Sequence, residues 1–197
     1  MNKVLNNLFE QLMRLPGIGR KTAQRIGFYI LKSTNNEIEA LVKSLIEAKQ
    51  KLHFCPECFN LTEDKICEIC QNSSRDHNLV CIVEDAADIL SIERSGKYLG
   101  IYHVLGGVLS PIDNIGPDAL KIKELVARVE KNNFKEIIIA TNPTREGEAT
   151  AYYLVKILKP YKTNISRIAR GLPIGSDLDL ADETTISEAF DGRTKFE

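Results

Sequence analysis

Two Cys-x-x-Cys pairs, separated by eight residues, place the strongest constraint on what this chain can fold into. Two cysteines three positions apart can face one ion from a tight turn, and two such turns complete a tetrahedron. The alternatives are two disulfides or a redox-active Cys-x-x-Cys pair, and the spacing favours zinc over both. The predicted ligands are Cys55, Cys58, Cys67 and Cys70. Four thiolates leave no position open for water, so the sequence predicts one structural Zn²⁺ per chain.

The residues around this site support the same interpretation. The segment 59–66 is too polar to build a core of its own, so metal binding should supply much of its folding free energy. His53 and His77 flank the site, but four cysteines already satisfy the ion. The fifth cysteine, Cys81, lies in an apolar run and is expected to be a small core residue in a chain suited to a reducing compartment. No apolar run approaches the roughly 20 residues of a membrane helix, and the first residues lack the layout of a signal peptide.

Charge is distributed unevenly along the chain. The formal net charge is −1, yet residues 1–51 carry nine Lys or Arg and four Asp or Glu, and the remainder carries a net charge of −6. A basic amino-terminal segment on an acidic body is what a localised phosphate-binding surface requires.

The basic segment is predicted to form two helices joined by a tight turn. Apolar residues recur at helical spacing up to Leu15, stop at Pro-Gly-Ile-Gly (16–19), and resume at Ala23. This arrangement resembles the helix-hairpin-helix DNA-binding motif, in which glycines allow close approach and N–H groups at the start of the second helix face a phosphate. The expected DNA-binding residues are Gly17, Gly19, Arg20, Lys21 and Arg25. None of these residues is expected to contact the edges of bases, so binding should be independent of DNA sequence. The alternative is a plain helical hairpin with a solvated basic face.

A third helix is expected over residues 36–50, with an apolar stripe as its core face, and a polar linker over 72–78. From residue 79 strands and helices alternate, which predicts a mainly parallel α/β sheet. The expected strands are 79–83, 101–105, 137–141 and 165–169, and the expected helices are 85–95, 119–131 and 148–158. In such sheets functional residues lie beyond the carboxyl ends of the strands, where Glu84 and the segment 141–148 are placed.

These two acidic stretches resemble the Toprim domain of topoisomerases, primases and some nucleases. Toprim enzymes hold magnesium with a glutamate after the first strand and an Asp-x-Asp after a later one; here Glu84 matches the glutamate, but Asn142 and Thr144 occupy the aspartate positions. An amide and a hydroxyl are poor replacements for two carboxylates as magnesium ligands. The sequence therefore predicts an inactive Toprim domain used for contacts. The remaining carboxylates, which could still gather a weak metal, are Glu84, Asp85, Asp88, Glu146 and Glu148.

The order of these modules resembles the RecR family of bacterial recombination mediators over essentially the whole chain. The expected fold class is α/β, in a multi-module α+β chain with a helix-hairpin-helix domain at 1–53, a four-cysteine zinc finger and linker at 54–77, a Toprim domain at 78–172 and a carboxy-terminal helix and tail at 173–197. The resemblance implies a non-enzymatic, cytoplasmic, nucleoid-associated protein that forms a ring, expected to be a tetramer, around DNA. It also implies that the protein acts with RecO, and often RecF, to load recombinase onto single-stranded DNA.

The carboxy-terminal segment has two interpretations. Asp177, Asp179 and Asp182 suggest a metal or nucleotide cluster, but no Gly-Lys-Ser/Thr loop accompanies them, so a charged surface between subunits is the better interpretation. A short helix is expected over 182–190.

For the whole chain, two functions compete with a DNA clamp: a magnesium-dependent nuclease or topoisomerase-like enzyme, and an adaptor that contacts only proteins.

Overall fold

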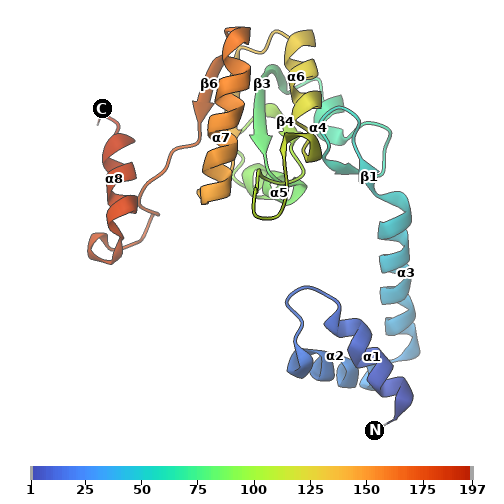
Figure 1. Cartoon of the computed structure of the whole chain (residues 1–197). Helices are drawn as coiled ribbons and strands as arrows, with labels where there is room; N and C mark the ends of the chain where they lie inside the picture. Colours follow the sequence, from blue (N-terminus) through green and yellow to red (C-terminus); the bar gives the residue numbers. More distant parts are fainter. Residues whose placement is uncertain (1, 196–197) are drawn as a thin grey trace. The chain divides into compact units, whose positions relative to one another are not determined.

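A four-stranded parallel sheet organises the larger of the two units into which the chain divides, residues 53–197. The structure is a computed structural model and describes residues 2–195. The strands lie in the order β4-β3-β5-β6 (Figure 1). Their bounds are β3 Asp76–Val83, β4 Gly100–Val104, β5 Glu136–Ala140 and β6 Asn164–Arg167. The chain passes from β3 to β4 on one side and then to β5 on the other side of β3, so the topological switch point lies between β3 and β5.

The two inner strands are apolar on both faces because both faces are covered. Residues Val80–Val83 of β3 are all buried, and so are Ile137 and Ile139 of β5. In the register of the sheet, Val83 pairs with Val104 on β4 and with Ala140 on β5. The residues that follow β3 and β5 therefore meet at one edge, as the alternating pattern predicts.

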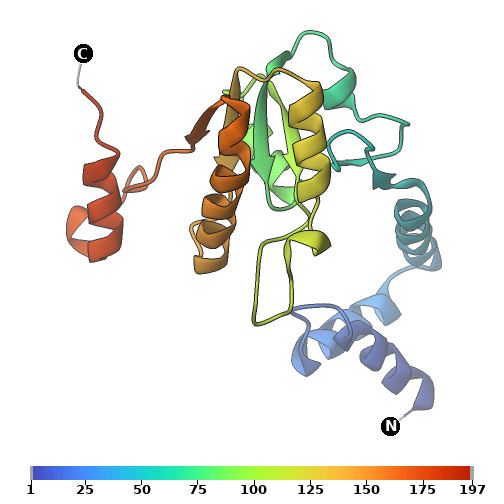
Figure 2. The same ribbon diagram turned by 45° about the horizontal axis from the view of Figure 1, so that its top comes forward.

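Helices cover the sheet on both sides (Figures 1 and 2). Helices α6 (Ile122–Lys131) and α7 (Arg145–Leu158) lie on one face, and α5 (Ala86–Arg94) lies on the other. The larger core cluster joins Leu125 of α6 and Leu154 of α7 to the strands, whereas Ile89 of α5 packs with a second cluster on the opposite face. This three-layer arrangement confirms the predicted parallel α/β sheet.

Two helices begin at positions that differ from the expected ones. Helix α7 starts at Arg145 instead of residue 148, because Thr144 caps it by accepting a hydrogen bond from the Gly147 N–H (3.0 Å). Helix α6 starts at Ile122 instead of residue 119, because a 3₁₀ turn, η1 (Pro117–Ala119), and an extended Leu120 come first. A side-chain cap sets the start of α7 and a turn sets the start of α6, and apolar periodicity reveals neither.

The zinc module is a small hairpin and one helical turn, and it lies against the β4 edge of the sheet. It consists of β1 (His53–Phe54), antiparallel to β2 (Leu61–Thr62), and α4 (Glu68–Gln71). The Val104 N–H donates to the Cys58 carbonyl (2.8 Å), and the Phe59 ring stands edge-on to the His103 ring with centroids 5.4 Å apart. The module is thereby joined to the sheet by backbone and aromatic contacts.

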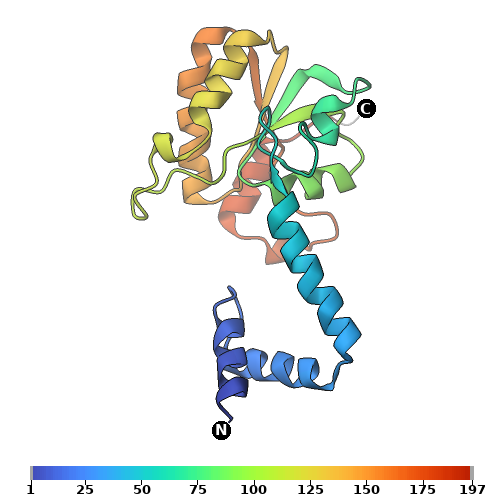
Figure 3. The same cartoon turned by 90° about the vertical axis from the view of Figure 1, so that its right-hand side faces the viewer.

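The amino-terminal unit, residues 1–52, is helical. Helices α1 (Lys3–Met13) and α2 (Arg20–Lys32) pack as a hairpin that buries Phe9 and Ala23 (Figure 3). Helix α3 (Asn35–Lys51) begins with a capping box in which Thr34 and Glu37 exchange hydrogen bonds. Figure 3 shows α3 extending away from the α1–α2 pair.

The apolar stripe of α3 is not a core within one chain. None of its residues is buried, and most of the stripe is exposed to solvent. The exposed members are Leu41, Val42, Leu45 and Ile46. The expectation that this stripe forms a core is therefore wrong for the single chain, because no other element in the described part of the unit, residues 2–52, buries it.

After β6 the chain runs through one short element to the last helix. A 3₁₀ turn, η2 (Lys159–Tyr161), precedes β6; η3 (Leu178–Leu180) and α8 (Glu183–Asp191) follow it. Throughout the described chain, residues 2–195, no helix is both long enough and apolar enough to cross a bilayer.

Candidate functional sites

The four cysteines of the two pairs come together as one buried cluster. Their sulfur atoms all lie within 4.8 Å of one another, and the Sγ atoms of Cys58 and Cys67 are 3.4 Å apart. Tetrahedral zinc with Zn–S bonds of about 2.3 Å places its sulfurs roughly 3.8 Å apart, so the cluster fits this ion. Among residues 2–195, it is the only such group of three or more Cys, His, Asp or Glu side chains.

Hydrogen bonds within the cluster shift the pKa values of its thiols in opposite directions. Bonds from the thiols of Cys58 and Cys70 lower the pKa of Cys67, and the same contacts raise the pKa values of Cys58 and Cys70. The Cys67 thiolate is therefore stabilised by its neighbours, whereas these hydrogen bonds and burial disfavour loss of the protons of Cys58 and Cys70. A bound cation is what allows all four groups to ionise together.

His103 is buried where the zinc module meets the sheet. Its Nε2 lies 2.8 Å from the Lys121 carbonyl, while its Nδ1 is buried without a hydrogen-bond partner in the described chain. Burial lowers the pKa of this imidazole to about 4. The ring is therefore neutral at pH 7 and donates from Nε2, next to the Phe59 ring.

The hairpin presents its cations to solvent. Gly17 has φ +77°, a left-handed conformation that favours glycine, and turns the chain between α1 and α2. Gly19 is the N-cap of α2 and offers no side-chain cap, so the first N–H groups of the helix remain available to an anion. Arg20, Lys21 and Arg25 are exposed, and none forms an ion pair within residues 2–195. All five predicted residues therefore lie at or near one helix start.

The carboxyl edge of the sheet holds the residues that match the Toprim pattern. The Glu84 side chain, only 8% exposed, accepts hydrogen bonds from the Asn142 backbone N–H (2.7 Å) and from its Nδ2 (2.6 Å). Thr144 is engaged as the cap of α7. A Cβ atom at Gly147 would lie 2.1 Å from the Asn142 carbonyl oxygen and 2.8 Å from the Glu84 Oε1, so only glycine allows α7 to approach this closely. Both oxygens of Glu84 are thus satisfied by one asparagine.

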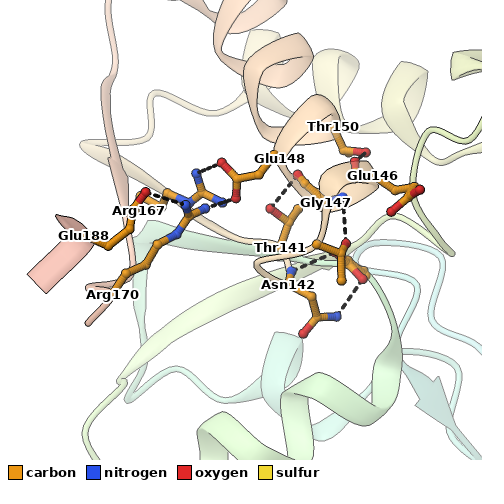
Figure 4. Close-up of polar contacts among 11 residues, drawn as sticks. Thr141, Asn142, Glu146, Gly147, Glu148, Thr150, Arg167, Arg170 and Glu188 are labelled. Carbon is orange, nitrogen blue, oxygen red and sulfur yellow. Dashed lines mark hydrogen bonds and ion pairs between the residues drawn. The ribbon is translucent and has the colours of Figure 1, made fainter. Parts of the chain in front are cut away.

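Other carboxylates at this edge also have partners from the protein. Asp88 accepts from the Asp85 N–H (2.8 Å) at the start of α5. Glu148 forms ion pairs with Arg167 and Arg170, one of which joins Arg167 Nη1 to Glu148 Oε2 at 2.7 Å (Figure 4). Glu146 remains half-buried on α7. The carboxylates expected to gather a weak metal do not form a ligand cluster anywhere in residues 2–195.

Sequence reasoning missed the arginines of this edge. Arg167 ends β6, and Arg170 follows it and pairs both with Glu148 and with Glu188 of α8 (3.6 Å), as Figure 4 shows. The pairing of β6 with β5 brings the residues after β6 to the same edge as those after β5, and no signal in the sequence specifies this pairing.

Asp182 has a local role in the carboxy-terminal segment. It caps α8, accepting from the Thr185 N–H (2.9 Å), and this bond lowers the pKa of its carboxyl group. Asp177 and Asp179 are exposed near η3. Within residues 2–195 the three aspartates do not gather into a metal-binding group.

Four family models match consecutive parts of the chain. They are the RecR helix-hairpin-helix (residues 5–49), the RecR four-cysteine zinc finger domain (52–72), the Toprim domain (78–169) and the RecR C-terminal model (171–194). The chain is also similar along its length to proteins named Recombination protein RecR. It is 51% identical to that of Rippkaea orientalis, covering 98% of both chains, and 51% identical to that of Carboxydothermus hydrogenoformans, covering 96% of both. With the protein of Thermobifida fusca it shares 46% identity over 96% of this chain and 95% of the relative. The fold, the cysteine cluster and these similarities together show that the chain belongs to the RecR family of recombination proteins.

Proposed function

We propose that this chain is a non-enzymatic, DNA-binding mediator of recombinational DNA repair. It binds DNA without sequence preference, assembles into a ring-shaped tetramer, and acts with RecO and RecF to help load recombinase on single-stranded DNA. The observation that carries the proposal is the contrast between an open, cationic helix start in the hairpin and a Toprim edge whose Glu84 is occupied by protein donors. The first supports phosphate binding, and the second argues against magnesium chemistry.

The hairpin supplies the DNA contact. Free N–H groups at the start of α2 and the side chains of Lys21 and Arg25, one turn apart, favour neighbouring phosphates of one strand. These groups make no base-specific contact by themselves, so affinity should depend on salt much more than on sequence.

The Toprim domain acts as a contact surface without catalysis. Magnesium needs several hard anionic oxygens that are free to coordinate it. Glu84 is held by Asn142, and Glu148 is held by Arg167 and Arg170. Family membership supports RecO and RecF as the proteins that contact this region, with Glu84, Asp88, Asn142, Thr144, Glu146 and Glu148 as the proposed contact residues.

The zinc site is structural in this proposal. The four sulfurs of Cys55, Cys58, Cys67 and Cys70 would hold one Zn²⁺ and complete its coordination, leaving no position for substrate. The ion would fix the hairpin β1–β2 and the turn α4 in a segment with little apolar core. Because a thiolate site of this kind persists best in a reducing compartment, we place the protein in the cytoplasm, at the nucleoid.

Two exposed apolar surfaces support a closed assembly. One lies on the amino-terminal unit, where the α3 stripe and Phe28, Tyr29 and Leu31 of α2 are exposed. The other lies on the carboxy-terminal segment and includes Ile174, Leu178, Leu180 and Phe190. If each surface pairs with the same surface of another copy, the two kinds of contact alternate around a ring. Each copy then has two different neighbours, and four copies form the smallest ring that allows this. Light scattering should give the molar mass of four chains.

The DNA-binding proposal is tested by the double variant Lys21→Ala/Arg25→Ala. Each lost phosphate contact reduces the steepness of the plot of log affinity against log salt by about 0.7 to 0.9, so the double variant should flatten it by about 1.4 to 1.8 per contacting subunit. Binding should weaken alike on all sequences. Stability should change by no more than about half a kcal/mol, because both side chains are exposed.

The matched control is Lys156→Ala/Lys97→Ala, which removes two exposed cations from the second unit. The hypothesis is wrong if the hairpin variant binds labelled DNA as tightly as this control with an unchanged salt slope, and the adaptor function then takes its place.

Incubating the unmodified protein with magnesium and the same DNA tests the enzyme alternative, because cleavage or relaxation at a useful rate would refute the non-catalytic role.

A further inference from the structure

A groove of about 600 Å³ lies between the zinc module and helix α5. One wall comes from the segment 61–69 of the zinc module, and the other comes from the outer side of α5. Both walls belong to the second unit, and Ile69 of α4 packs with the core cluster that contains Ile89 of α5. The groove is therefore a built part of the fold. None of its lining residues belongs to the carboxyl edge of the sheet.

The lining of the groove includes two leucines that the chain itself does not cover. Ile89 is buried beneath it, but Leu61 on one wall and Leu90 on the other are 46% and 61% exposed. Two exposed leucines facing a shared hollow are suited to hold an apolar side chain between them.

Charge on the groove has one predominant sign. Glu63, Asp64 and Glu68 are exposed along the zinc-module wall, and none forms an ion pair within residues 2–195. The one arginine of the lining, Arg75, is already neutralised by Glu93, which also accepts from the Tyr102 hydroxyl (2.5 Å). The available charge is therefore entirely negative, which repels nucleic acid and favours a cationic partner.

We propose that this groove binds a basic amphipathic segment of a partner protein. An apolar side chain of the segment lies between Leu61 and Leu90, while its Lys or Arg residues pair with Glu63, Asp64 and Glu68. The charge complementarity of the rim selects the partner, and the leucines provide the buried anchor. Because no residue of the groove belongs to the hairpin, this proposal does not depend on the DNA-binding role.

The test uses the full-length protein and a short fluorescein-labelled peptide in which leucines alternate with pairs of lysines. Fluorescence anisotropy should show binding of this peptide and no binding of the matched peptide with glutamate in place of lysine. The charge-reversal variant Glu63→Lys/Asp64→Lys should weaken binding about tenfold or more, since it places like charges across the contact. The control Glu57→Lys/Glu124→Lys makes the same change of charge on the other side of the zinc module, where both residues line a different hollow. It should change the affinity by less than about twofold.

A second pair of variants distinguishes a seated segment from general attraction to an acidic surface. Leu90→Ser leaves the charge unchanged and should weaken binding about threefold to tenfold, because an apolar anchor loses its contact. Leu99→Ser removes a leucine of similar exposure, 68%, that does not line the groove, and should have no effect. The proposal is overturned if Leu90→Ser and Leu99→Ser bind the peptide equally, or if both charge reversals lose the same affinity.

Two further measurements separate other occupants and the DNA-binding role. If the groove is filled by a second copy of this chain, Glu63→Lys/Asp64→Lys lowers the molar mass measured by light scattering, which also overturns the proposal. DNA retardation by the Leu90→Ser protein should equal that of the unmodified protein. Failure of peptide binding with intact DNA binding therefore rejects the groove alone.

Discussion

The cysteine cluster and the carboxyl edge of the sheet are both places where ligand-type side chains gather, but their partners differ. The four sulfurs lie within 4.8 Å of one another and find hydrogen-bond partners mainly among themselves. At the carboxyl edge, Glu84 accepts from Asn142, and Glu148 lies between Arg167 and Arg170. The first cluster is short of positive charge, whereas the second already has its donors and cations from the protein.

The two clusters indicate how a site that needs a metal can be distinguished from one whose ligand groups are already paired. The residue types alone do not decide, because glutamates are present at the carboxyl edge in the expected places. The decisive feature is whether protein groups occupy the positions from which a cation would bind. At the carboxyl edge an amide and two guanidinium groups do so, whereas within residues 2–195 the partly buried hydrophobic side chains packed against the cysteine cluster are those of Ile66 and Ile69.

The largest expected effect comes from breaking the cysteine cluster. Cys58→Ser or Cys67→Ser removes one thiolate from a site whose metal contributes on the order of 10 kcal/mol in comparable zinc modules, so residues 53–72 should not fold and the protein should be poorly soluble. Zinc content by mass spectrometry and amide hydrogen exchange measure this. The control Cys81→Ala removes a buried thiol outside the cluster and should retain zinc. A soluble, cooperatively folding, metal-free Cys58→Ser protein that still binds DNA would contradict the interpretation.

A second effect should follow from His103, which lies where the zinc module contacts the sheet. Its pKa is about 4 in the folded chain, against an ordinary value of 6.5, so below pH 6.5 the unfolded chain takes up a proton that the folded chain refuses. Stability should therefore fall as the pH drops from about 6.5 toward 4, with a loss of about 2 kcal/mol already at pH 5.

The measurement is urea unfolding at pH 7 and pH 5 with zinc present. The His103→Gln variant keeps a donor for the Lys121 carbonyl and has no proton to gain, so it should lose about 2 kcal/mol less between the two pH values. Protonation of the zinc ligands is common to both proteins and cancels in the comparison. Equal acid sensitivity of the two proteins would show that His103 is not responsible.

Restoring carboxylates should move the carboxyl edge toward a metal site. Asn142→Asp/Thr144→Asp replaces a donor to Glu84 by a like charge, which should cost about 2 kcal/mol of stability without magnesium. Magnesium should recover that loss and bind more tightly than to the unmodified protein, but no efficient enzyme should result because no nucleophile is added. Thermal unfolding with and without magnesium checks this. Equal stabilisation of the unmodified protein by magnesium would remove the distinction between the two sites.

The smallest effect is expected for Glu148→Gln, which leaves the cations of Arg167 and Arg170 without their shared counter-ion. All three side chains are 20–28% exposed, so the cost should be about 1 kcal/mol after solvent screening. Magnesium should not recover it. Glu146→Gln, on the same helix and without an ion pair in residues 2–195, is the matched control and should change the free energy of unfolding by less than about 0.5 kcal/mol.

The sequence alone predicted a site correctly where residues close together in the chain determine its geometry. Cys55 and Cys58 lie on one turn, so their approach to a common point follows from local structure, and only the meeting of the two pairs needed the fold. The parallel sheet was predictable because β3 and β5 are apolar throughout, which is typical of strands covered on both faces. The meeting of Glu84 and Asn142 then followed from the placement of strand ends at one edge.

The sequence was insufficient where partners come from distant segments or from outside the chain. Arg167 and Arg170 reach Glu148 only because β6 pairs with β5, a strand order that the pattern of residues does not specify. The α3 stripe has the periodicity of a core helix, and periodicity does not say whether the covering surface belongs to the same chain. Helix starts at Arg145 and Ile122 were set by caps and turns instead of apolar spacing.

The bond between Glu84 and Asn142 also has a physiological consequence. A carboxyl edge that depends on magnesium changes its charge and shape when the free concentration of this ion changes, for example as nucleotides bind and release it. Here the amide is covalently part of the chain, so Glu84 keeps its hydrogen-bond partner whatever the free magnesium concentration. The charge and shape of Glu84 at this edge are thereby kept by a neighbouring side chain instead of by a soluble ion.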